Sequence, residues 1–343
     1  MSNKDFDSIM RKITSGLSGD FKQDIEYLQS QTEKYKDHEF GIEIARACGR
    51  LMFELIPDDK KEELNKAIGK DMLGYEAILD EVRFKIYQKD HAGALKIMEA
   101  LVSKYEELNM FADDSVSEYH NFKEFMEEIL YRHIYKPEKD LRRAEIDYAE
   151  IYLLYGSLLF ELGRHEDAIA ALEKAMKWNP MSASLAFEHA ENYKALGKLA
   201  EYEKCTREIF KIAYKPNDLA RCYRNLGYLY VENGEYDLAV CCETFSLQFE
   251  KSNLVQSELY YISTKTGKVF DPTLEDIQSA FETNGIPFGP DGDVMGIAYT
   301  YGKHFFDEKE YNAAAYFLDI FAGFVDDDEV NQMLEVAVKN MEE

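Results

Sequence analysis

The stretch 149–182 constrains the fold of this chain more than any other, because it contains two amphipathic helical patterns joined by a short turn. In the first pattern, small or apolar residues recur at positions i, i+3, i+4 and i+7, and these are Tyr152, Tyr155, Gly156 and Leu159. The second pattern contains Ala168, Leu172 and Ala175, and Pro180 follows it. The stretch therefore predicts a helix–turn–helix unit of 34 residues.

The same unit recurs further along the chain. Three kinds of residue repeat together, with successive spacings of 34, 37 and 75 residues. They are the small residues of the first helix (Gly156, Ala190, Gly227, Gly302), the turn residues (Gly163, Gly197, Gly234, Lys309) and the second-helix residues (Ala168, Tyr202, Ala239, Ala314). Because the three series agree, the pattern indicates a tandem array of helical hairpins.

This pattern resembles the tetratricopeptide repeat (TPR), in which a small residue and flanking aromatics on the first helix precede a small residue on the second helix and a closing proline. The resemblance implies an all-α fold, a right-handed solenoid of stacked antiparallel helix pairs. It also implies a concave groove lined by the first helix of each pair. The second unit departs from the pattern, because His189 and Tyr202 stand where larger apolar and small residues are usual.

The spacings divide the chain into a cap, a repeat region and a final helix. Residues 1–70 show helical periodicity without the repeat pattern and predict an N-terminal helical cap, and 329–343 predict a C-terminal capping helix. Within the repeat region 71–328, the expected units are 71–108, 109–148 (irregular), 149–182, 183–219, 220–253, 254–294 (irregular) and 295–328. In the first irregular unit we expect a helix that begins at Asp113, Asp114 or Ser115 and ends at Lys136-Pro137.

Charge and cysteine content indicate the cellular compartment and which classes of partner are disfavoured. The net charge is −26, which would repel nucleic-acid phosphates and anionic membranes, so neither is expected as a partner. Five cysteines without C-x-x-C spacing fit reduced thiols, and no leader or long uncharged apolar run is evident. We therefore expect a cytoplasmic protein.

No motif for catalysis, metal binding or cofactor binding is evident. His189-Ala190-Glu191 matches half of a zinc-deaminase motif, but the P-C-x-x-C half is missing. Asp291-Gly292-Asp293 lacks the twelve-residue acidic pattern of a calcium loop and predicts a turn. We expect no enzymatic activity, no metal and no cofactor, although a catalyst in the 284–293 region stays open as an alternative.

The candidate binding residues lie on the helix face beside the repeat core. At 100° per residue, this face of the third matching unit combines arginines with an aromatic ring, and neighbouring units add a lysine and further rings. The candidate groove residues are Phe160, Phe187, Lys194, Arg221, Arg224, Asn225 and Tyr228. Arginine beside aromatics is typical of binding hot spots. The alternative is that Arg221 and Arg224 pair with acidic residues of adjacent helices.

Two functions fit these features. The first is a non-catalytic scaffold or adaptor whose groove binds another protein or a peptide segment. The second is a signalling regulator of the bacterial peptide-sensing kind, in which residues 1–70 form an effector module rather than a cap. The N-terminal segment shows no basic surface for DNA, which argues against DNA-binding by that module.

Overall fold

The structure is a computed structural model that describes residues 3–57, 74–108 and 111–341. The remaining residues include parts of the predicted cap and of the first two predicted repeats (58–73 and 109–110), which lie outside the described residues. The fold is all-α, a helical-repeat solenoid with one small sheet in the described part of the chain. It divides into two compact units: Met1–Asn121 with Pro137–Leu158, and Phe122–Lys136 with Leu159–Glu343.

The first unit begins with three helices, α1 (Asn3–Thr14), α2 (Phe21–Lys34) and α3 (Gly41–Glu54). Their apolar faces form a core of their own, to which Phe40, directly before α3, and Val116 also contribute. The buried side chains of this core are Phe6, Ile13, Leu28, Phe40, Ile44, Ala47, Cys48 and Val116. The predicted N-terminal segment therefore contains a small module with its own hydrophobic core.

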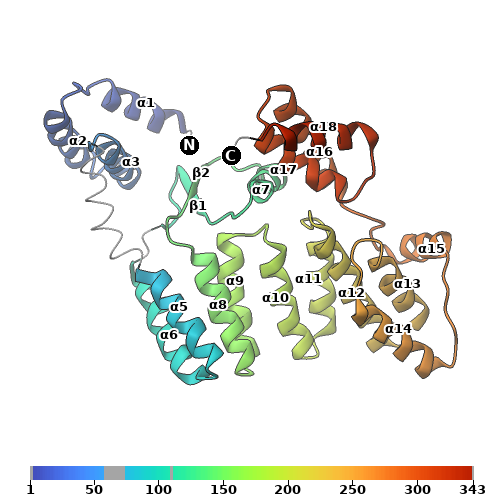
Figure 1. Ribbon diagram of the computed structural model, residues 1–343. Helices are drawn as coiled ribbons and strands as arrows, with labels where there is room; N and C mark the ends of the chain where they lie inside the picture. The colour runs from blue at the N-terminus through green and yellow to red at the C-terminus, as the bar shows by residue number, and fades with distance from the viewer. Residues whose placement is uncertain (1–2, 58–73, 109–110, 342–343) are drawn as a thin grey trace. The chain divides into compact units, whose positions relative to one another are not determined.

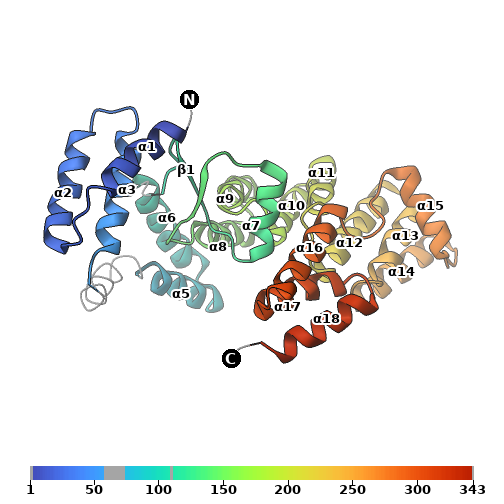
Figure 2. The same ribbon diagram turned by 90° about the horizontal axis from the view of Figure 1, so that it is seen from above.

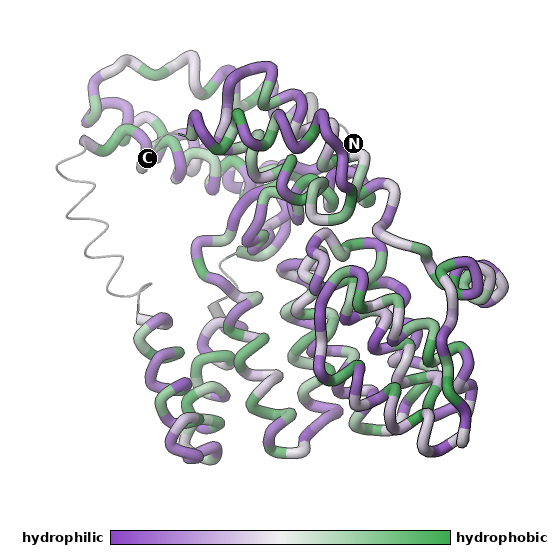
Figure 3. Tube along the Cα trace, turned by 45° about the vertical axis from the view of Figure 1, so that its right-hand side comes forward, coloured by the Kyte–Doolittle hydropathy of each residue, from purple (hydrophilic) through white to green (hydrophobic). Residues whose placement is uncertain are grey.

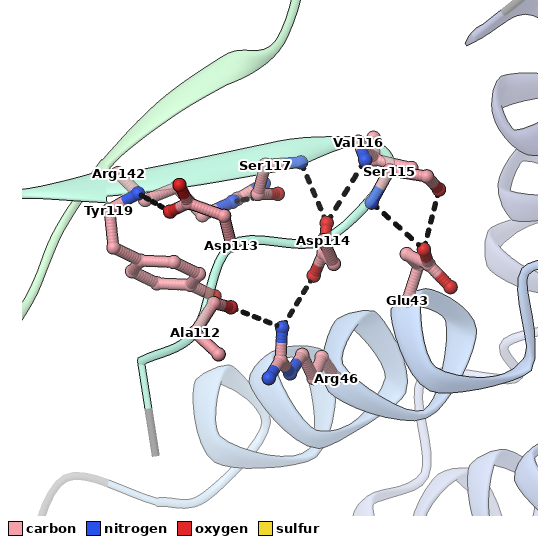
Figure 4. Close-up of polar contacts among 10 residues, drawn as sticks. All are labelled: Glu43, Arg46, Ala112, Asp113, Asp114, Ser115, Val116, Ser117, Tyr119 and Arg142. Carbon is pink, nitrogen blue, oxygen red and sulfur yellow. Dashed lines mark hydrogen bonds and ion pairs between the residues drawn. The ribbon is translucent and has the colours of Figure 1, made fainter. Parts of the chain in front are cut away.

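Polar contacts hold this module to the segment before the first strand (Figure 4). Arg46 of α3 donates hydrogen bonds to the carbonyl oxygen of Ala112 (2.9 Å) and to the Asp114 carboxylate (2.7 Å). The Glu43 carboxylate accepts a hydrogen bond from the Ser115 backbone N–H (3.1 Å). The Arg46–Asp114 pair is partly buried, which makes it stronger than a fully exposed ion pair.

The rest of the first unit is a helix pair, a sheet and the start of a further helix. The pair is α5 (Gly74–Tyr87) and α6 (His91–Leu108), and α8 (Tyr148–Glu161) begins within this unit. Three tyrosines pack edge to face along this helix set, with ring centroids 6.4 Å apart for Tyr75 and Tyr105 and 5.7 Å apart for Tyr105 and Tyr148. The tyrosine rings therefore fill the space between these helices.

The segment 109–148 contains strands that we did not predict. Strands β1 (Ser117–His120) and β2 (Asp140–Arg143) pair in parallel, with Ser117 opposite Asp140. Asp114 does not begin a helix, because its carboxylate accepts hydrogen bonds from the backbone N–H groups of Val116 (3.0 Å) and Ser117 (2.7 Å) and turns the chain into β1. The expected start of the helix at 113–115 is therefore wrong.

Helix α7 (Phe125–Tyr135) follows β1 and belongs to the second unit. A capping box between Glu124 and Glu127 begins it. It ends at Lys136, whose backbone is left-handed with φ 47°, directly before Pro137. The predicted break at Lys136-Pro137 is confirmed.

The second unit is a series of helical hairpins that stand side by side in chain order from α9 to α14 (Figure 1). Its helices are α9 (His165–Trp178), α10 (Ala183–Ala195), α11 (Leu199–Ile209), α12 (Pro216–Asn233), α13 (Tyr236–Ser246) and α14 (Asn253–Thr266). The next helix, α15 (Leu274–Asn284), packs against α13. The turn residues predicted from the spacing all have positive φ: Gly163, Gly197, Gly234 and Lys309. The hairpin turns are therefore where the sequence places them.

The C-terminal helices pack back onto an earlier part of the second unit. They are α16 (Gly292–Asp307), α17 (Tyr311–Ala322) and α18 (Asp328–Lys339). Helix α16 lies beside α7 (Figure 2), and the Tyr316 hydroxyl accepts a hydrogen bond from the Met126 backbone N–H (3.3 Å). Phe317 shares one core with Met126 and Leu130. The last hairpin thus contacts a helix far away in sequence.

Hydropathy alternates along the helices rather than forming long apolar runs (Figure 3). Among the described residues, no helix combines the length and the apolar character needed to cross a bilayer.

Candidate partner-binding face

Helices α10 and α12 carry six of the seven candidate residues. Ser182 begins α10, since its hydroxyl accepts a hydrogen bond from the Leu185 N–H (3.4 Å). Pro216 occupies the first turn of α12, and Gly234 ends that helix in a left-handed conformation. Because the two helices are successive first helices of neighbouring repeats, the same face of each is presented together. We call this surface the α10–α12 face.

The α10–α12 face places a guanidinium over an aromatic ring. The guanidinium carbon of Arg221 lies 4.4 Å from the centre of the Phe187 ring, which suits a cation–π contact. Phe187 itself is buried, with 1% of its surface exposed. Arg221 also pairs with two acids of α10, Glu191 (3.5 Å) and Glu188 (3.8 Å). Of the Arg221–Phe187 pair, the guanidinium is therefore the part that is accessible to solvent.

A second cation–aromatic pair lies about two helical turns away. The Lys194 ammonium is 4.2 Å from the centre of the Tyr228 ring and 3.6 Å from the Glu191 carboxylate. Arg224 forms an ion pair of 2.7 Å with Glu250. Both arginines thus pair with acids of adjacent segments, and the pairing alternative is confirmed.

The other two candidates lie apart from this cluster. Asn225 is buried, and its amide donates a hydrogen bond to the Thr206 hydroxyl (3.4 Å) on α11. Phe160 lies near the end of α8, where its ring packs edge to face on His165 (5.0 Å). Only Lys194, Arg221, Arg224 and Tyr228 therefore form a compact, partly exposed set.

A buried acid beneath this face is missing from the predicted set. Glu243 of α13 is 3% exposed, and its Oε2 atom has no hydrogen-bond partner among the described residues. Burial raises the pKa of Glu243 to about 8, with a further contribution from the Glu258 carboxylate, while Arg224 and Lys194 act in the opposite direction. One signal was available in the sequence, a single acid within the apolar run 238–245.

The repeat glycine on α12 is explained by this acid. A Cβ added at Gly227 would lie 2.4 Å from Oε1 of Glu243, far inside van der Waals contact. The close approach of α12 and α13 therefore depends on the absence of a side chain at this repeat position.

The comparison with known families agrees with the hairpin geometry. A family model described as tetratricopeptide repeat matches residues 149–180, the stretch in which the repeat unit was first evident. The chain therefore contains a tetratricopeptide repeat.

Two individual proteins are similar to this TPR chain. The human protein O-mannosyl-transferase TMTC1 is 28% identical over 174 residues, which cover 48% of this chain and 19% of the human protein. A solved structure of a tetratricopeptide repeat protein from Parabacteroides merdae is 14% identical, with a TM-score of 0.41, and the match covers 92% of this chain and 99% of that one. At that TM-score the likeness carries no conclusion about fold or function.

The two motif-like sequences of the TPR chain have structural explanations. Asp291 is the N-cap of α16, because its carboxylate accepts hydrogen bonds from the N–H groups of Asp293 (2.8 Å) and Val294 (3.4 Å). The segment is therefore the start of a helix, and the predicted turn at 291–293 is wrong. His189 is a buried residue of α10, and no cluster of metal-ligating side chains occurs within residues 3–57, 74–108 and 111–341.

Proposed function

We propose that this TPR chain is a non-catalytic scaffold that binds a segment of another protein on the α10–α12 face. One observation carries the proposal: two cation–aromatic pairs, Arg221 with Phe187 and Lys194 with Tyr228, lie together on neighbouring repeats. Arginine and tyrosine are enriched in binding hot spots. TPR folds are generally used for protein interaction, which supports a scaffold role.

The ion pairs on this face are compatible with binding. The Arg221 side chain is 34% exposed and its partner Glu188 is 41% exposed. Because such exposed pairs contribute little, about 0–1 kcal/mol each, they can be exchanged for contacts with carboxylates or backbone carbonyls of a bound segment. The binding would be sensitive to salt, since these contacts are electrostatic.

The proposed location is the cytoplasm, and no nucleic acid or membrane is proposed as a partner. All five cysteines are free thiols. Burial raises the pKa of the Cys222 and Cys242 thiols, which supports a packing role rather than a reactive one. The net charge of −26 disfavours binding to phosphate-rich surfaces.

The experiment is affinity capture from a native lysate with the wild type and with Arg221→Glu plus Arg224→Glu. A loss of about 2 kcal/mol per hot-spot residue, or about thirtyfold each, is expected for partners of this face. The matched control is Lys265→Glu plus Lys339→Glu, which changes the charge equally at exposed positions on α14 and α18. If both variants capture the same partners as the wild type, the assignment to this face is wrong.

A second candidate function is a peptide-sensing regulator whose N-terminal module acts on a target. The separate core of α1–α3 and its polar attachment through Arg46 and Glu43 support this candidate. Deletion of residues 1–56 distinguishes it from a cap. Loss of a cap would lower the melting temperature, because apolar surface would become exposed, whereas loss of an effector module would leave folding and partner capture intact.

A further inference from the structure

A pocket lies on the side of α10 that is turned toward the second helices, and the proposed partner-binding residues are not part of it. Its volume is about 590 Å³, and α7, α9, α10 and α11 contribute its walls. The lining is mostly apolar and includes Ile134, Tyr135, Met176, Met181, Ala186 and Ile209. Pockets of about 300–1,000 Å³ with apolar walls and a few polar groups are typical of small-molecule sites. We call it the α9–α11 pocket.

The wall contributed by α7 is open to solvent. Ile134 is 42% exposed and Tyr135 is 57% exposed, although both are large apolar residues at the end of that helix. Exposure of such residues beside an apolar pocket indicates a surface that an apolar molecule could cover.

One buried polar atom at this pocket has no partner. His189 is 8% exposed and lines the pocket, and its Nε2 has no hydrogen-bond partner in the part of the chain that the structure describes. The closest acid, Glu173, also lines the pocket, and its carboxylate is 3.9 Å from Nε2, too far for a hydrogen bond. An unpaired buried donor or acceptor is costly, so a ligand group that pairs with it would bind favourably.

The surroundings of the His189 ring determine whether Nε2 is a hydrogen-bond donor or acceptor. Cys205 Sγ lies 3.7 Å from His189 Nδ1. Burial lowers the pKa of His189 and raises the pKa of Cys205, so both groups are neutral at pH 7. The Glu173 carboxylate on the Nε2 side favours the ring proton on that nitrogen, and Nδ1 then accepts from the Cys205 thiol. His189 thus presents an N–H donor.

The charges around the pocket balance. Three lysines and three glutamates line it: Lys177, Lys204, Lys211, Glu173, Glu201 and Glu208. Lys211 and Glu208 form an ion pair of 2.7 Å. The surroundings therefore favour neither an anion nor a cation.

We propose that the α9–α11 pocket binds an uncharged, largely apolar small molecule through a hydrogen bond from His189 Nε2–H to an oxygen acceptor such as a ketone carbonyl. This site is separate from the α10–α12 face and does not depend on the function proposed for it. It also explains a departure in the repeat pattern, since His189 occupies a position where a larger apolar residue is usual.

Two probes of nearly equal shape test the hydrogen bond, acetophenone and α-methylstyrene, because only the ketone has an acceptor. Each is titrated into protein labelled with ¹⁵N at histidine, and binding is followed by NMR of the His189 ring. We expect the Nε2–H tautomer in the free protein, a shift of its signal with acetophenone, and binding of the ketone about fivefold tighter than the alkene.

Two variants complete the test. In His189→Phe, which keeps an aromatic ring but no donor, the affinity ratio of the two probes, followed by ligand signals, should fall to about one. In Tyr135→Ala, a change in an exposed wall residue, both probes should weaken equally and the ratio should stay unchanged. If His189→Phe does not fold, the response of the wild-type His189 Nε2–H signal to acetophenone decides whether the hydrogen bond forms. Absence of binding, or equal affinities in the wild type, overturns the proposal.

Discussion

Replacement of Glu243 by glutamine should remove a pH-dependent loss of stability. The side chain is 3% exposed and its Oε2 is unpaired among the described residues. Burial therefore favours the neutral acid, and the pKa rises from 4.5 to about 8 in the folded protein. Glutamine has nearly the same shape and cannot ionise, so Glu243→Gln keeps the packing against Gly227 and removes the titration.

The sign and size follow from the two pKa values. Below pH 4.5 the acid is protonated in both the folded and the unfolded chain, so its ionisation does not lower the free energy of unfolding there. Between 4.5 and about 8 only the unfolded chain loses its proton, so each pH unit lowers the free energy of unfolding by about 1.4 kcal/mol. The loss is about 3 kcal/mol at pH 7 and about 5 kcal/mol once the folded acid also ionises.

The assay is urea unfolding of the wild type and Glu243→Gln at pH 5, 7 and 9. Relative to the wild type, the variant should gain about 3 kcal/mol between pH 5 and 7, and about 4 kcal/mol between pH 5 and 9. Glu232→Gln, a change at an exposed carboxylate of α12, is the control and should follow the wild type. Parallel profiles for the wild type and Glu243→Gln would refute a buried acid with a raised pKa.

Three further experiments use urea unfolding to test a close contact, a strained backbone position and an ion pair. Gly227→Ala should cost about 1–3 kcal/mol, because the new Cβ would meet the Glu243 side chain at 2.4 Å, and an unchanged stability would contradict that contact. Lys309→Gly should gain up to about 1 kcal/mol, since its φ of 63° is strained for lysine, and a loss would argue against the strain. In a double-mutant cycle, Arg46→Ala and Asp114→Ala should show a coupling energy of about 1.5–3 kcal/mol. If their effects on the free energy of unfolding are additive, this ion pair does not hold the N-terminal module in place.

The candidate site was predictable to the extent that it depends on helical periodicity. Counting 100° per residue brought Arg221, Arg224 and Tyr228 onto one face of α12, and equal repeat spacing brought Lys194 of α10 beside them. The same reasoning could not show that Asn225 is buried or that Arg224 pairs with Glu250, because these depend on the distance between helices. Periodicity specifies an angle around one helix and not the depth at which a side chain lies.

The sequence by itself determined the hairpins of this protein: where they turn, which residues face their cores, and which small residues let the helices approach. These properties are local, since a left-handed turn at Gly197 or a proline after a helix depends only on neighbouring residues. Only the tertiary structure decided the pairing of β1 with β2, the packing of α16 against α7 and the burial of Glu243. The first two join segments far apart in the chain, and all three depend on surfaces that meet only when helices pack together.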